Sequence, residues 1–69
     1  MRAILRLTYD VTPSRAFTWG YDVRRAGVPA TRVYLSSPVT ASEVQESLVH
    51  YDGYPNDTTV RRGPRFIIK

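Results

Sequence analysis

Hydrophobic and polar residues alternate along two stretches near the start of the chain. Between residues 2 and 11, one side carries Ala3, Leu5, Leu7, Tyr9 and Val11. Between residues 16 and 25, one side carries Phe17, Trp19, Tyr21 and Val23. A period of two is typical of a half-buried strand, because successive side chains point to opposite faces of a sheet. The pattern predicts two strands, and the turn-forming residues 12–15 predict that these strands form a hairpin.

A third alternating stretch follows a break in the pattern at Gly27 and Pro29. Residues 32–36 place Val33 and Leu35 on one side. We therefore expect a third strand here, with these two side chains in the core.

The pattern changes from strand to helix at residue 40. Thr40 is a favoured N-cap residue, and Glu43 has the spacing of its capping-box partner. Val39 and Val44 have the spacing of a hydrophobic staple. One apolar stripe then follows at helical spacing: Val44, Leu48 and Tyr51. The spacing predicts a helix over residues 40–51.

The last apolar run of the chain lies at its end. Phe66 and the two isoleucines after it give residues 64–69 the composition of a short strand. We expect residues 61–64, which lead into it, to be irregular. The elements together predict an α+β fold. Three antiparallel strands occupy residues 1–37, one helix packs on one face of the sheet, and a short C-terminal fourth strand closes it.

The chain has 69 residues and no cysteine, so residues 1–69 should form one small domain with a thin core. The lack of cysteine excludes a disulfide framework and a thiolate metal site. A thin core leaves self-association, for instance as a homodimer, as a further source of stability. No apolar run approaches the about 20 residues of a membrane span or forms a signal peptide, so we expect a cytoplasmic protein without a membrane partner.

Charged residues are segregated along the chain, whose formal net charge is +4. Residues 1–38 and residues 60–69 each carry a net charge of +4, whereas residues 39–59 carry a net charge of −4. Such segregation marks either different faces of one domain or segments that pair with each other. All basic residues except Lys69 are arginine. This bias fits a GC-rich bacterial or phage genome, and arginine also binds phosphates, base edges and carboxylates well.

A helix on the apolar face would leave a basic and polar face on the other side of the sheet. That face would display Arg2, Arg6, Thr8, Thr18, Arg24, Arg32, Tyr34 and Ser36. A ribbon of two or three strands can enter the major groove of DNA, where arginine binds guanine and hydroxyl groups contact phosphates. The C-terminal tail would add phosphate contacts from Arg61, Arg62 and Arg65. The pattern therefore predicts a non-enzymatic module that binds nucleic acid, with DNA favoured over RNA.

Two observations favour a different interpretation of this face. Antiparallel sheets commonly leave one face solvated without any ligand, and long arginine side chains can cover apolar neighbours. Asp10 and Asp22 also point outward in the predicted sheet and would repel phosphates.

The pattern of residues in 19–25, 32–35 and 40–43 is similar to that of two families of DNA-binding domain. These are the ethylene-response-factor type domain and the arm-site-binding domain of tyrosine integrases. The resemblance covers roughly half of the chain and implies three antiparallel strands backed by one helix. It also implies that the sheet reads DNA, which is compatible with an acidic helix.

The alternative function is binding to a protein with an acidic surface. A small phage-encoded inhibitor of a host nuclease or defence complex, similar in kind to an anti-CRISPR protein, would use arginines and exposed tyrosines as hot spots. Its anchors would be Tyr34, Tyr54 and Arg65.

The sequence indicates no enzyme, metal or cofactor. His50 is the only histidine, so a nucleophile and base pair would depend on it alone. Asp52, Asn56 and Asp57 do not have the spacing of a calcium-binding loop. The four glycines are scattered and form no phosphate-binding loop.

Overall fold

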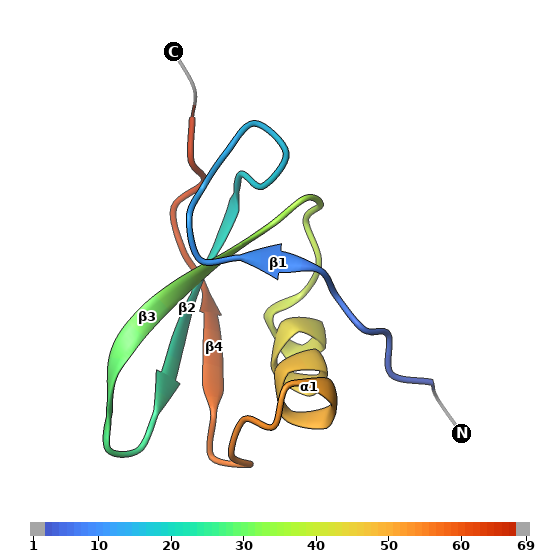
Figure 1. Cartoon of the computed structure of the whole chain (residues 1–69), viewed down its shortest axis with the longest axis vertical. Helices are drawn as coiled ribbons and strands as arrows, with labels where there is room; N and C mark the ends of the chain where they lie inside the picture. The colour runs from blue at the N-terminus through green and yellow to red at the C-terminus, as the bar shows by residue number, and fades with distance from the viewer. Residues whose placement is uncertain (1–2, 68–69) are drawn as a thin grey trace.

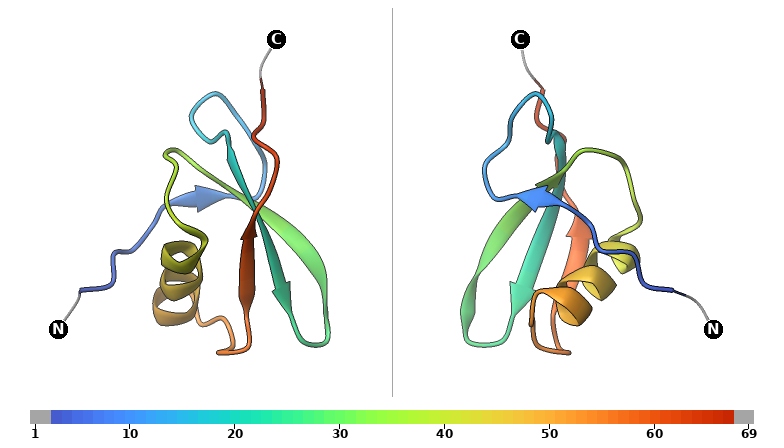
Figure 2. Two further views of the ribbon diagram at one scale, coloured as in Figure 1. Left: turned by 180° about the vertical axis from the view of Figure 1, so that it is seen from behind. Right: turned by 45° about the vertical axis from the view of Figure 1, so that its right-hand side comes forward.

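The computed structural model describes residues 3–67 and shows a four-stranded sheet with one helix (Figure 1). The elements are β1 (Tyr9–Asp10), β2 (Trp19–Arg25), β3 (Val28–Leu35), α1 (Ala41–Tyr51) and β4 (Thr59–Arg62). The strands are antiparallel and have the order β1-β3-β2-β4. Helix α1 lies on one side of the sheet, and the views of Figure 2 show no element of the described chain on the other side, which we call the open face. The predicted α+β fold with one helix is confirmed.

The core lies between β2, β3 and α1. Its buried apolar side chains are Tyr21, Val23, Val33, Leu35, Val44 and Leu48. The sheet members of this group alternate along β2 and β3, and Tyr21 lies opposite Val33 in the antiparallel ladder. The inward face predicted for these two strands is therefore correct. Trp19 also packs against the core but is only half-buried, because it lies at the end of β2.

The start of α1 follows the predicted capping arrangement. Thr40 is the N-cap, and its hydroxyl oxygen accepts a hydrogen bond from the Glu43 backbone N–H at 3.1 Å. The same hydroxyl donates to the Glu43 carboxylate at 3.1 Å. Both members of the predicted staple, Val39 and Val44, lie in or against the core. The helix thus begins one residue after Thr40, and the cap satisfies the backbone N–H of Glu43.

The hydroxyl group of Tyr21 ties the sheet to the segment that precedes the helix. It accepts a hydrogen bond from the Val39 backbone N–H at 2.9 Å and donates one to the Val39 carbonyl oxygen. Tyr21 itself is completely buried. One side chain therefore fills the centre of the core and satisfies both polar groups of a loop residue.

The first predicted strand is wrong over most of its length. Only Tyr9–Asp10 form a strand, and β1 pairs with β3 instead of forming a hairpin with β2. Residues 3–8, which we call the N-terminal arm, leave the sheet and cross α1. The Leu7 N–H donates to Ser47 Oγ at 3.0 Å, and the Tyr51 hydroxyl donates to the Ile4 carbonyl at 2.6 Å.

The arm changes the expected burial of several apolar residues. Leu5 is 69% exposed instead of lying in the core. Tyr51, predicted in the inward stripe of the helix, is 41% exposed and contacts the arm, whereas Ser47 is buried beneath it. An extended arm presents side chains on alternate sides just as a paired strand does, so the period of two did not distinguish the two structures.

Strand β3 begins at Val28, four residues earlier than predicted. Gly27 makes the turn after β2 with φ of 73°, a left-handed conformation that glycine adopts without steric cost. Pro29 does not end the strand. It lies in the part of β3 that β1 does not cover, and a proline is tolerated at such an edge.

The fourth strand lies at Thr59–Arg62, whereas residues 64–67, the described part of the strand predicted at 64–69, form no strand. Residues 61–62 are regular instead of irregular. It pairs with β2, whose residue Asp22 lies opposite Arg61. The chain then continues beside β2, because Gly63 N–H donates to the Gly20 carbonyl at 3.0 Å and Phe66 N–H to the Thr18 carbonyl at 2.8 Å. Ile68 and Lys69 lie outside the described residues.

Candidate functional site

The open face carries a row of charged side chains across three adjacent strands. Asp22 of β2 lies opposite Arg32 of β3 on one side and opposite Arg61 of β4 on the other. Arg24 lies two residues from Asp22 along β2 and therefore points to the same face. The sheet thus brings three arginines together around one aspartate.

Asp22 holds one of these arginines in place. Its Oδ1 atom accepts a hydrogen bond from Arg32 Nε at 2.9 Å, and the two side chains are 28% and 46% exposed. Hydrogen bonds with Asp22 and with Tyr34 raise the pKa of Arg32. An exposed pair of this kind adds little to stability, but it fixes the direction of the guanidinium group.

The other two arginines form no ion pair with any carboxylate among residues 3–67. Arg24 and Arg61 line two shallow hollows together with Asp22. The hollows have volumes of about 320 and 300 Å³. Positive charge without a partner in the described chain is therefore concentrated at the Arg24 and Arg61 end of the open face.

Two glycines leave room for neighbouring groups at the open face. A Cβ atom on Gly20 would collide with the Pro64 carbonyl oxygen and lie 3.3 Å from the Tyr34 ring. A Cβ atom on Gly63 would lie 3.1 Å from the Asp22 carboxylate. Tyr34 and Asp22 can therefore lie close against the backbone of the neighbouring strand. Tyr34 is half-buried in this position and presents part of its ring to solvent.

Several residues predicted for the sheet face or the C-terminal tail of the nucleic-acid site do not lie on the open face. Arg6 is on the helix side, with Nη2 4.0 Å from Asp52 Oδ1 and its guanidinium carbon 5.8 Å from the centre of the Tyr51 ring. Arg62 pairs with Tyr21 in the ladder and so points to the face opposite that of Arg61. Thr8 belongs to the arm, and Ser36 lies beyond the end of β3. Arg2 lies outside the described residues.

Arg65 binds to the end of β2 and not to the open face. Its guanidinium carbon lies 3.9 Å from the centre of the Trp19 ring, and its Nε atom donates to Thr18 Oγ1 at 3.3 Å. This cation–π contact covers part of an aromatic ring that the core leaves half-buried. Of the predicted site residues, the structure brings together Arg24, Arg32, Tyr34 and Arg61.

The acidic segment of the chain lies on the helix side. Burial, a hydrogen bond with Tyr54 and the nearby Asp52 carboxylate raise the pKa of Tyr9. Arg25 covers the Tyr54 ring with its guanidinium carbon 4.4 Å from the ring centre. The acidic residues of α1 and Asp52 thus lie on the opposite side of the sheet from the arginine row, and two basic residues, Arg6 and Arg25, lie on their side. The anchors suggested for a protein partner do not share one surface, since Tyr34 is on the open face and Tyr54 packs against the core from the helix side.

Comparisons with protein-family models, curated proteins and solved structures each find no match. Within residues 3–67, no helix is long and apolar enough to cross a membrane, and no group of acidic or histidine side chains is arranged to hold a metal ion. The function must therefore be inferred from the open face itself.

Proposed function

We propose that this protein binds nucleic acid through the open face of its sheet. One observation carries the proposal: Arg24, Arg32 and Arg61 come from three adjacent strands and gather on the face that no helix covers in the described chain. The guanidinium group binds phosphate oxygens and guanine edges in bidentate fashion. Arg24 and Arg61 are the main contacts, and Tyr34 supplies an aromatic surface beside Arg32.

The width of the row supports duplex DNA as the ligand. Arg32 and Arg61 lie on strands separated by β2, which corresponds to two strand spacings or about 10 Å. The major groove of B-DNA is about 12 Å wide, so the span of β3, β2 and β4 matches its width. Asp22 disfavours a phosphate at the middle of the row, which leaves phosphates to Arg24 and Arg61 at its end.

The salt dependence of binding follows from the number of arginines on the face. The two arginines left to phosphates, Arg24 and Arg61, predict a slope of log affinity against log salt of about −2. A tail that also contributed Arg62 and Arg65 would give a steeper slope. We expect the shallower slope because those two side chains lie elsewhere.

The test compares two double variants that remove the same charge from different faces. Arg24→Ala with Arg61→Ala removes the two arginines of the row that form no ion pair within residues 3–67, and Arg6→Ala with Arg62→Ala is the matched control. We expect the first variant to lose affinity for mixed-sequence duplex DNA and to flatten the salt slope by about 2. The control should keep most of its affinity and most of its salt slope. Both are measured by fluorescence anisotropy at several salt concentrations. Equal losses in the two variants, or no binding by the wild type at low salt, would contradict the proposal.

A further inference from the structure

Arg32 differs from the other two arginines of the open face in how its guanidinium group is held. Its Nε atom donates to Asp22 Oδ1 at 2.9 Å, whereas Arg24 and Arg61 form no ion pair within the described chain. Tyr34 lies two residues further along β3 and therefore on the same face. Hydrogen bonds with Asp22 and with Tyr34 raise the pKa of Arg32. Two neighbouring side chains thus hold this guanidinium group in position.

The contact with Asp22 leaves donors of Arg32 for a ligand. The carboxylate binds the Nε atom, and the remaining N–H donors of an arginine are on its two Nη atoms. The Arg32 side chain is 46% exposed although it is held in this way. Two coplanar N–H donors of a guanidinium group match the O6 and N7 acceptors that guanine presents in the major groove. Arg32 therefore combines a fixed guanidinium plane with the donors that guanine requires.

The negative charge of Asp22 affects which part of a duplex Arg32 can contact. A carboxylate beside the guanidinium group offsets its positive charge and repels a phosphate that approaches the same place. The edge of guanine has no formal charge, so it loses much less from this neighbour. Arg24 and Arg61 are not bonded to a carboxylate in the described chain, which favours them as the phosphate contacts.

We propose that Arg32 reads guanine in the major groove and that Asp22 positions its guanidinium group for this contact. Arg24 and Arg61 hold the neighbouring phosphates. This inference rests on the proposed function, because it names the part of the duplex that the open face distinguishes. The ligand is therefore duplex DNA that contains guanine, and not any polyanion of the same charge.

Two duplexes of one G·C-rich sequence test this assignment, one with guanine and one with 7-deazaguanine. The analogue lacks the N7 acceptor but keeps the base pairs, the length and the number of phosphates. We define the guanine ratio as the affinity for the first duplex divided by the affinity for the second. In fluorescence anisotropy, the wild type should have a guanine ratio of at least about 5. Arg32→Ala should lower the ratio to about 1 and leave the salt slope unchanged, because Arg32 contacts a base.

Two changes at Asp22 separate its positioning role from its charge. Asp22→Ala removes both, so the guanine ratio should fall while the affinity for the 7-deazaguanine duplex rises, because a negative charge near the phosphates is lost. Asp22→Asn keeps an oxygen that can accept from Arg32 Nε, so its ratio should stay above that of Asp22→Ala. An unfolded variant would lose affinity for both duplexes. A lower ratio together with a higher affinity for the analogue therefore cannot come from unfolding.

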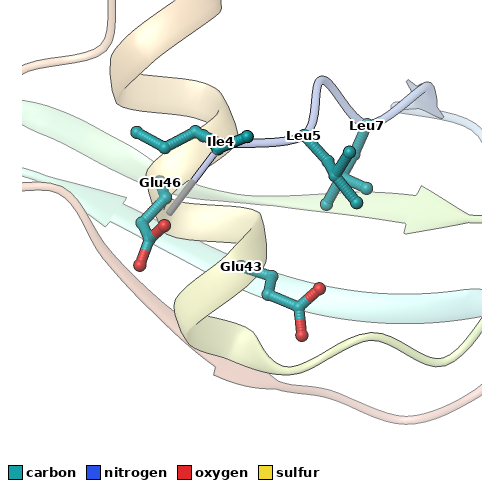
Figure 3. A pocket seen from close by; sticks show the side chains of 6 residues that line it. Ile4, Leu5, Leu7, Glu43 and Glu46 are labelled. Atoms are coloured by element: carbon teal, nitrogen blue, oxygen red, sulfur yellow. The ribbon is translucent and has the colours of Figure 1, made fainter. Parts of the chain in front are cut away.

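Glu43→Gln is the matched control, because it removes one negative charge from the helix side of the molecule. Glu43 lies on α1 beside the hollow between the helix and the N-terminal arm (Figure 3). Glutamine can also complete the capping box with Thr40, so the variant should fold. Its guanine ratio should equal that of the wild type.

The outcomes separate this inference from the proposed function. A wild-type guanine ratio near 1, with binding that still depends on Arg24 and Arg61, would overturn the role of Arg32 and leave the proposed function standing. So would an Arg32→Ala variant that keeps the ratio, or one that flattens the salt slope by about 1, since Arg32 would then contact a phosphate. A wild type that binds neither duplex at low salt would overturn both.

Discussion

Tyr21 connects the sheet to the start of the helix through one hydroxyl group, and Tyr21→Phe removes only that group. The ring is completely buried and would keep its packing. The Val39 N–H and carbonyl would lose their partner, and water cannot replace a hydroxyl inside the core without rearrangement. Leaving such groups unsatisfied costs about 1 to 3 kcal/mol.

This cost is large for so small a domain. At about 0.05 to 0.15 kcal/mol per residue, the free energy of unfolding of a 69-residue chain is about 3 to 10 kcal/mol. A loss of 1 kcal/mol lowers the melting temperature of a domain of this size by about 4 to 8 °C. Tyr21→Phe should therefore melt at least about 4 °C below the wild type in thermal unfolding followed by circular dichroism.

Tyr51→Phe is the control, because its hydroxyl also bonds a backbone carbonyl but the residue is 41% exposed. Water can satisfy the Ile4 carbonyl after the change, so the control should lose less stability than Tyr21→Phe. If the two variants melt at the same temperature, or if Tyr21→Phe is as stable as the wild type, the role assigned to the Tyr21 hydroxyl is wrong.

Four further changes test separate parts of the structure. Thr40→Ala removes the helix cap and should cost about 1 kcal/mol in urea unfolding. Gly20→Ala places a Cβ atom against the Pro64 carbonyl and should lower the midpoint of the same transition. Thr58→Val removes a buried hydroxyl that has no partner within the described chain, so stability should be unchanged or higher by up to about 1 kcal/mol. The raised pKa of Tyr9 stabilises the folded state fully below its ordinary pKa of about 10, and this contribution is lost as the pH rises beyond it. Unfolding measured above pH of about 10 should therefore show a steeper loss for the wild type than for Tyr9→Phe.

The elements that the sequence predicted correctly are those whose local pattern has one structural solution. The helix has a cap at Thr40 and an apolar stripe, and both signals are local. Strand β2 combines alternation with large aromatic side chains, and its inward residues are the ones that the core buries. Local signals of this kind are reliable because the same residues that produce the pattern also make the contacts.

The pairing of the outer segments could not be predicted in this way. The arm has the alternation of a strand, but its polar groups are satisfied by Ser47 and Tyr51 of the helix, which are distant in sequence. The apolar residues of the C-terminal tail suggested a strand, yet the regular ladder with β2 ends at Arg62. Both outcomes depend on which segment finds a partner and not on local composition.

The candidate site was predicted only in part, because some of its residues lie on segments whose pairing the sequence did not predict. Alternation along β2 and β3 placed Arg24, Arg32 and Tyr34 on one face, as in the structure. Arg6 was assigned to that face only because the arm was treated as a strand. Arg61 reached the face through the register of β4, and the β-branched residues Thr58 to Val60 were the only sequence signal for that strand.

Mapping the surface that contacts DNA is the most direct test of the account. In a two-dimensional ¹H–¹⁵N NMR titration with duplex DNA at low salt, the backbone and side-chain Nε–H signals of Arg24, Arg32 and Arg61 should shift most. The Nε–H signal of Arg65 and the backbone signals of α1 should change little, because these groups do not lie on the open face. Shifts concentrated on α1 or the N-terminal arm, or no shifts at all, would contradict the assignment of the open face as the site that binds nucleic acid.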